Sequence, residues 1–190
     1  ETFNATAQGV CEGQQLHMEF EQRNDVSIDE YIEMIRLKTA VLVGGAMKLG
    51  AIVGGASTTD AELLYQFGEN VGVAFQLQDD ILDVYGNPEK FGKQVGGDII
   101  SNKKTFLHLK SMALAEPAEV SILKSDSNQH VQKVKEVTKI YNKYQIKELA
   151  TAEMNTYLAA AQSSLNALSI ADEKKNEFRE LVQQIMEREQ

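Results

Sequence analysis

The sequence predicts an all-α fold in a single domain. Apolar residues recur at helical spacing along most of the 190 residues, and capping motifs precede three of the apolar stretches. No stretch alternates between apolar and polar residues as a half-buried strand does, and no linker or repeat divides the chain. The length suits one domain with a sizeable core.

The first capped helix begins at a capping box, Ser27 to Glu30, and its apolar spacing continues to about residue 54. The stretch 40–56 is apolar, but Lys48 interrupts it and it is shorter than the roughly 20 residues of a membrane span. We therefore expect a close-packed buried helix there. A second capping box, Thr59 to Glu62, begins a long helix that ends near Tyr85.

Residues 86–102 form the one substantial predicted loop, because Gly86, Asn87 and Pro88 break the helix and further glycines follow. A helix is predicted again over about 103–114. Amphipathic spacing then predicts helices at 119–124, 127–145, 147–167 and 172–188. Ser169 is interpreted as the start of the capping motif of the last helix.

Charge and cysteine content exclude several functional classes. The 19 basic and 28 acidic residues give a net charge of −9, which argues against a nucleic-acid-binding surface. The single cysteine, Cys11, excludes an internal disulfide and a cysteine-based zinc site, and we expect a reduced, cytoplasmic protein. His17, His108 and His130 lack ligand spacing, so each is interpreted as a surface or satisfied core residue.

A polar stripe runs along the predicted 59–85 helix, within the stretch AFQLQDDILDVYG. At 3.6 residues per turn, several side chains fall within about 60° of Gln76. They are Asp79, Asp80, Asp83 and Asn87. Apolar residues cover most of the remaining circumference, which is typical of a buried helix. We therefore expect the stripe to face an internal cavity.

The composition of this stripe favours metal binding over a solvated helix face. The stripe contains no lysine and places like charges three and four residues apart, which is unfavourable. Carboxylates near a core need a compensating partner. Aspartates one turn apart suit Mg²⁺, which takes one or two carboxylates together with water and substrate phosphates. The pattern predicts a magnesium site.

The segment after the stripe adds candidate phosphate-binding residues. Lys93 lies among glycines, and Lys103 is at the N-terminus of the next predicted helix. Lysines bind phosphate as point charges. The spacing does not match a Walker A loop, and no G-x-G-x-x-G motif occurs. A diphosphate held by Mg²⁺ and lysines fits these residues better than a P-loop nucleotide does.

Five motifs in order resemble the trans-type polyprenyl diphosphate synthases, the isoprenoid chain-elongating enzymes. They are GQQLHMEFE at 13–21, IRLKTAVL at 35–42, the FQ-x-x-DD-x-x-D motif at 75–83, GKQVGGD at 92–98 and NKKT at 102–105. The resemblance implies an isoprenoid synthase helical bundle and a class I prenyltransferase. Such an enzyme ionises an allylic diphosphate and condenses it with isopentenyl diphosphate.

The resemblance also implies roles for individual residues. Asp79, Asp80 and Asp83 would hold Mg²⁺, with Asp98 in support. Lys38, Lys93 and Lys103 would contact diphosphate, and Gln14 would lie in the same pocket. Thr39 and Gln76 would lie beside the reacting carbons. A homodimer is expected on the same basis.

Two departures from the family pattern affect these expectations. His17 stands where the family usually has the aspartate of GQ-x-x-D. The family's first aspartate-rich motif and its basic isopentenyl diphosphate ligands do not occur in these 190 residues. We therefore expect the C-terminal portion of a synthase that lacks the N-terminal helices and is inactive alone. The alternatives are a non-catalytic helical subunit of a prenyl synthase and a class I terpene cyclase.

Overall fold

The computed structural model describes residues 1–87, 95–126 and 129–187, and within these ranges all regular elements are helical. In chain order they are α1 (Thr2–Gln22), α2 (Ile28–Ile35), the π-helix η1 (Arg36–Ala40), α3 (Val41–Val53), α4 (Thr58–Tyr85), α6 (Gly97–Ile100), α7 (Phe106–Leu114), α8 (Pro117–Leu123), α9 (His130–Lys143), α10 (Ile146–Asn166) and α11 (Asp172–Glu187). The predicted all-α class is therefore confirmed.

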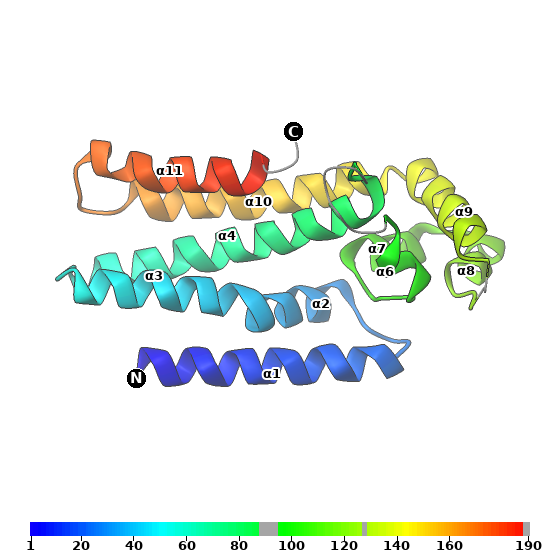
Figure 1. Cartoon of the computed structure of the whole chain (residues 1–190), viewed down its shortest axis with the longest axis horizontal. Helices are drawn as coiled ribbons and strands as arrows, with labels where there is room; N and C mark the ends of the chain where they lie inside the picture. Colours follow the sequence, from blue (N-terminus) through cyan, green and yellow to red (C-terminus); the bar gives the residue numbers. More distant parts are fainter. Residues whose placement is uncertain (88–94, 127–128, 188–190) are drawn as a thin grey trace.

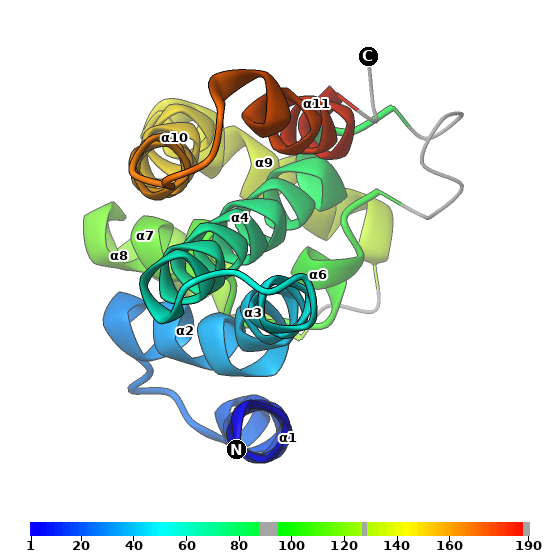
Figure 2. The ribbon, with the colours of Figure 1, turned by 90° about the vertical axis from the view of Figure 1, so that its left-hand side faces the viewer.

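The long helix α4 lies at the centre of the bundle. Viewed along the long axis, α10 and α11 lie on one side of α4, and α2, α3 and α1 lie on the other (Figure 2). The outermost helix, α1, packs against η1 and α3. The shorter helices α6 to α9 gather at one end of the long ones (Figure 1). This arrangement brings the second half of α4 close to α2, α6 and α7.

Buried apolar side chains form two clusters along α4. The larger cluster joins α1, α2, α4, α7 and α9, and it includes Phe20, Tyr31, Leu77, Leu107 and Tyr141. The smaller cluster joins the first half of α4 to α10 and α11. There the rings of Phe67 and Phe178 meet edge to face, with their centroids 5.7 Å apart. No helix within the described residues has both the length and the apolar character needed to cross a membrane.

The capping predictions are confirmed for one helix and wrong for two. Ser27 and Glu30 form the predicted capping box of α2. The N-cap of α4 is Ser57 rather than Thr59, and its hydroxyl accepts the Asp60 N–H at 3.0 Å. Ser169 lies before α11 but bonds to Asp60 of α4 through its N–H and its hydroxyl. A charged carboxylate is a strong acceptor, so Ser169 serves this tertiary contact.

The predicted 28–54 helix is continuous in direction but contains the π-helical turn η1. Its later part, α3, packs closely through Gly44 and Gly45, since a Cβ on either would overlap a neighbouring helix. Full burial of α3 is nevertheless wrong, because one face leaves large apolar side chains exposed: Leu42, Ile52 and Val53.

The predicted loop 86–102 contains a short helix. α6 forms because backbone N–H groups at its start bond to Asp83, a contact that local spacing does not reveal. Residues 88–94 lie outside the described ranges. The next helix, α7, begins at Phe106 rather than near Lys103. Its N-cap is Thr105, whose hydroxyl accepts the His108 N–H at 3.3 Å.

Candidate active site

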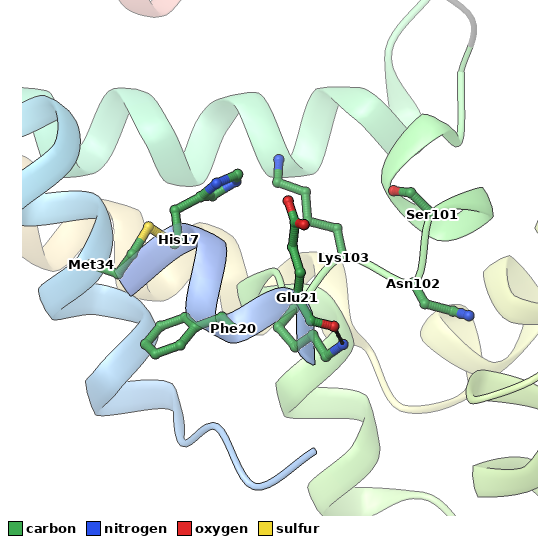
Figure 3. Close-up of a pocket in the computed structure, with 8 residues that line it drawn as sticks. His17, Phe20, Glu21, Met34, Ser101, Asn102 and Lys103 are labelled. Atoms are coloured by element: carbon green, nitrogen blue, oxygen red, sulfur yellow. Dashed lines mark hydrogen bonds between the residues drawn. The ribbon is translucent and has the colours of Figure 1, made fainter. Parts of the chain in front are cut away.

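A cavity of about 390 Å³ lies between α1, α2 and the segment that precedes α7 (Figure 3). Phe20 and Met34 supply its apolar contacts, and the other side chains around it are polar or charged: His17, Glu21, Ser101, Asn102, Lys103 and Lys104. In Figure 3, the side chains of His17 and Lys103 both extend toward the helix drawn across the top, which is α4. The cavity therefore places basic groups next to the helix that carries the acidic stripe.

Asp80 is the most buried member of the stripe, with 2% of its surface exposed. Its Oδ2 accepts the Tyr31 hydroxyl at 2.5 Å and the Phe106 N–H at 3.3 Å. Burial raises the pKa of Asp80 to about 7, although these donors and the charge of Lys103 oppose the shift. Asp80 thus joins α2, α4 and the start of α7 at one buried point.

Asp83 and Asp98 connect the stripe to Lys103. The Asp98 N–H donates to Asp83 Oδ2 at 3.0 Å, and the Lys103 ammonium lies 3.0 Å from Asp98 Oδ2. Burial raises the pKa of Asp83, and the charge of Asp98 adds to the shift. Burial lowers the pKa of Lys103, but the carboxylates of Asp98, Asp80 and Asp83 outweigh this and raise it overall. Lys103 therefore carries its charge at neutral pH.

The structure brings Thr39 of η1 and Gln76 of α4 together. The Thr39 hydroxyl donates to Gln76 Oε1 at 3.1 Å, which links η1 to α4. Both residues are half-buried. The hydroxyl thus bonds to a neighbouring helix rather than to its own.

Close backbone packing fixes the π-helical turn that carries Lys38 and Thr39. A Cβ on Gly13 of α1 would lie 2.2 Å from the Lys38 backbone nitrogen. On the opposite side, a Cβ on Gly72 of α4 would lie 2.6 Å from the Ala40 Cα. Only glycine permits such contacts, so η1 is held between α1 and α4 without intervening side chains. π-helical turns are frequent at functional sites.

Lys38 and His17 share the electropositive part of the site. Burial and the charge of Lys103 lower the pKa of Lys38, and Glu21 opposes the shift. Burial also lowers the pKa of His17, and both lysines lower it further. The groups that shift these pKa values come from α1, η1, α6 and the segment before α7, so four parts of the chain converge here.

The remaining predicted site residues are placed less directly. Asp79 is half-buried on α4, one turn before Asp83. Gln14 is exposed on α1 and does not line the cavity, although its neighbour Gly13 touches Lys38. Lys93 lies outside the described residues. The stripe residues are not among those that line the cavity. Lys103 does line it, and Lys103 pairs with Asp98, whose N–H donates to Asp83 of the stripe.

Hard oxygen donors are available, but they do not form a complete protein cage. Across the described ranges, no group of three or more His, Cys, Asp or Glu side chains is arranged to hold a metal ion. Asp80 Oδ2 is already bonded to Tyr31 and Phe106. Asp79 and Asp83 lie one turn apart on one helix face. Such a set fits Mg²⁺ that keeps water and substrate phosphates as its other ligands.

Tyr31 and His17 contribute to this site, although the sequence assigned neither of them a role. Tyr31 lies within the predicted 28–54 helix and was given no role, although a buried tyrosine hydroxyl normally needs a partner. His17 was interpreted as a surface or satisfied residue. Its position four residues after Gly13, on the same face of α1, is a signal that it points toward η1.

The family model described as polyprenyl synthetase matches residues 1–144, which is most of the chain. The chain belongs to the polyprenyl synthetase family. All five motifs noted in the sequence lie inside the matched region. The matched region therefore includes α1, the π-helical turn and the acidic stripe of α4.

Relatives in this family support the same assignment. The chain is 38% identical over 170 residues to the short chain isoprenyl diphosphate synthase of Methanothermobacter thermautotrophicus, covering 87% of this chain and 51% of the relative. It is 36% identical over 166 residues to the geranylgeranyl diphosphate synthase of Sulfolobus acidocaldarius, covering 84% and 49%. The chain thus spans about half the length of these curated relatives.

A solved structure confirms the fold. The crystal structure of a geranylgeranyl pyrophosphate synthase superposes with a TM-score of 0.90 at 40% sequence identity. The match covers 100% of this chain and 60% of that one. The bundle described above is therefore the helical fold of the polyprenyl synthetases.

Proposed function

We propose that the chain is the C-terminal part of a polyprenyl diphosphate synthase. The whole protein ionises an allylic diphosphate and condenses the resulting cation with isopentenyl diphosphate, which lengthens an isoprenoid chain. The observation that carries this proposal is the cavity lined by Lys103 and Lys104, with the charge of Lys38 close by, next to the helix that carries the acidic stripe. A diphosphate and a divalent cation need these two surfaces side by side.

The acidic stripe is proposed to hold Mg²⁺ through Asp79, Asp80 and Asp83, with Asp98 in support. Bound Mg²⁺ supplies positive charge that stabilises the leaving diphosphate. Because Asp80 Oδ2 is engaged by Tyr31 and Phe106, Asp80 contributes mainly by fixing the helix. Asp98 holds the Lys103 ammonium at 3.0 Å, which keeps one cation of the protein beside the site.

The basic residues are proposed to bind the diphosphate, and the polar pair on η1 and α4 to face the reacting carbons. Lys38 lies on η1 and Lys103 lies before α7, and their charges interact with each other. Lys93 and Gln14 belong to the same proposal. The Thr39 hydroxyl donates to Gln76, so its lone pairs and the second lone pair of the Gln76 carbonyl remain available to a cation. Fixed dipoles of this kind stabilise charge without reorganisation.

The segments that complete the enzyme are proposed to precede Glu1 in the gene. The relatives are about twice as long, and the chain contains one aspartate-rich motif. An in-frame upstream sequence with a second DD-x-x-D motif would support a synthase. Its absence would favour a non-catalytic subunit instead.

The decisive experiment is a product assay on the protein encoded by the whole gene. Purified protein is supplied with Mg²⁺, isopentenyl diphosphate and an allylic diphosphate, and the prenyl products are separated by chain length. We expect elongation that EDTA abolishes and that Asp79→Asn lowers by roughly 10²-fold or more. The control is Asp29→Asn, which changes an exposed aspartate on α2. Equal activity of both variants would reject the proposed site.

A further inference from the structure

The cavity contains a histidine to which the proposed reaction assigns no role. His17 lies on α1 and lines the cavity together with Lys103 (Figure 3). Its Nδ1 is buried, and among the described residues no donor or acceptor bonds to it. A buried polar atom without a partner is unfavourable, so such an atom is a candidate for contact with a ligand. Within the described residues, Nδ1 of His17 thus lacks the partner that a satisfied core histidine would have.

Four charged side chains from different parts of the chain act on the imidazole of His17. Lys38 on η1 and Lys103 before α7 disfavour a charged imidazole, whereas Glu21 on α1 and Asp98 on α6 favour it. Burial is the largest effect, and the net result is a pKa below the ordinary value of a histidine. In the unliganded protein, a neutral imidazole thus lies beside two ammonium groups at pH 7.

We propose that His17 is a further substrate-contacting residue, which bonds to the bound diphosphate and takes up a proton when the diphosphate binds. This inference rests on the proposed function, because it takes the ligand to be a diphosphate. The multiple negative charges of that ligand offset the two lysines that keep the imidazole neutral. Both ring nitrogens then donate, and one of them reaches the ligand.

A histidine suits this position better than a carboxylate for binding an anion. A carboxylate on α1 would pair with Lys38 or Lys103 and compete with the ligand for their charge. A neutral imidazole does not add to the carboxylate of Asp98, which already pairs with Lys103, and it supplies a further positive charge only after the anion has entered. The consequence is that diphosphate binding strengthens as the pH falls through the pKa of His17 in the complex, and stops strengthening below its lower pKa in the free protein.

The test measures proton uptake directly. The protein encoded by the whole gene is titrated with inorganic pyrophosphate and Mg²⁺ by calorimetry between pH 6 and 8, in two buffers with different ionisation enthalpies. We expect His17→Gln to take up fewer protons than the wild type, by up to about one per site. Wild-type binding should strengthen by up to about tenfold for each unit that the pH falls in this range, and the variant should lack this part of the pH dependence. The pyrophosphate's own protonation is common to both proteins and cancels in the comparison.

Two further variants complete the experiment. His130→Gln changes an exposed histidine on α9 and is expected to match the wild type. His17→Asn provides a second non-titrating side chain, and thermal unfolding shows that each variant is folded.

Unchanged proton uptake in both His17 variants, with pyrophosphate binding that Asp79→Asn still weakens, overturns the role of His17 and leaves the synthase proposal intact. Failure of the wild type to bind pyrophosphate overturns both.

Discussion

Asp80 shows how a single buried carboxylate organises the site at the residue scale. An aspartate that is 2% exposed is unfavourable unless its oxygens are bonded. The Tyr31 hydroxyl and the Phe106 N–H supply those bonds from two other helices. The sequence correctly indicated that the stripe needed a compensating partner. It attributed the compensation to metal alone, because Tyr31 lies 49 residues away in the chain.

Removing the Tyr31 hydroxyl tests this contact. Tyr31→Phe leaves Asp80 with one fewer donor in a dry environment, and we expect a loss of roughly 1–3 kcal/mol in the free energy of unfolding. Denaturant titration measures it. Tyr85→Phe is the matched control, because its hydroxyl bonds to Asn142 at an exposed position and should cost less. Equal losses of unfolding free energy in the two variants would show that the buried Tyr31–Asp80 hydrogen bond stabilises the fold no more than the exposed Tyr85–Asn142 bond does.

Gly13 makes a second residue-scale prediction. Gly13→Ala places a methyl group 2.2 Å from the Lys38 nitrogen, so α1 or η1 must shift. We expect a destabilisation of about 1–3 kcal/mol. The control is Gly50→Ala on α3, where nothing lies within 4 Å of the added Cβ. That variant should be stabilised by up to about 1 kcal/mol, since alanine favours helix. Thermal unfolding of both variants gives the comparison.

The π-helical turn η1 is the informative feature at the element scale. Helical periodicity predicted one helix from residue 28 to about 54, and its direction and length are confirmed. The π geometry over Arg36–Ala40 occurs where Gly13 and Gly72 approach closely from other helices. The spacing of apolar residues along one helix cannot predict that approach, because it involves residues of other helices. Resemblance to a family nevertheless placed Lys38 and Thr39 in the site, and the structure brings Thr39 against Gln76.

The contact between η1 and α4 leads to a prediction for catalysis. Thr39→Val keeps the shape of the side chain but removes the hydroxyl that donates to Gln76. We expect kcat for chain elongation to fall by roughly 10-fold or more while KM changes little, because the pair acts on the cation rather than on ground-state binding. Steady-state kinetics on the whole protein measure both constants. Thr151→Val on α10 is a control, since its hydroxyl bonds to its own helix.

At the scale of the whole molecule, Asp60 anchors the last two helices to the central one. Its carboxylate accepts the Ser57 hydroxyl, the Ser169 N–H and the Ser169 hydroxyl. From the sequence, Ser169 was assigned to the capping motif of the last helix, and Thr59 rather than Ser57 to that of the central one. Their assignment was wrong because Ser169 lies 109 residues from Asp60, and only the folded chain shows that the two meet.

The Asp60 cluster predicts a dependence of stability on pH. Hydrogen bonds from Ser169 and Ser57 lower the pKa of Asp60 below its ordinary value. Its contribution is therefore full above the unfolded-state pKa of about 3.9 and is lost as the pH falls through the folded-state pKa. We expect Asp60→Asn to lower the Tm at pH 7 and the difference from wild type to shrink in acid. The exposed Asp29→Asn should show no comparable effect at either pH.

The 28 residues of α4 connect this anchor to the acidic stripe. At 1.5 Å per residue, Asp83 lies about 35 Å along the axis from Asp60. If α4 tilts as a rigid rod about its first turn, each degree moves its far end by roughly 0.6 Å. Displacements of that size matter in catalysis, where about 1 Å of misplacement costs roughly 10²-fold in rate. The seating of α10 and α11 on the first half of α4 thus has mechanical leverage over the acidic stripe near its other end.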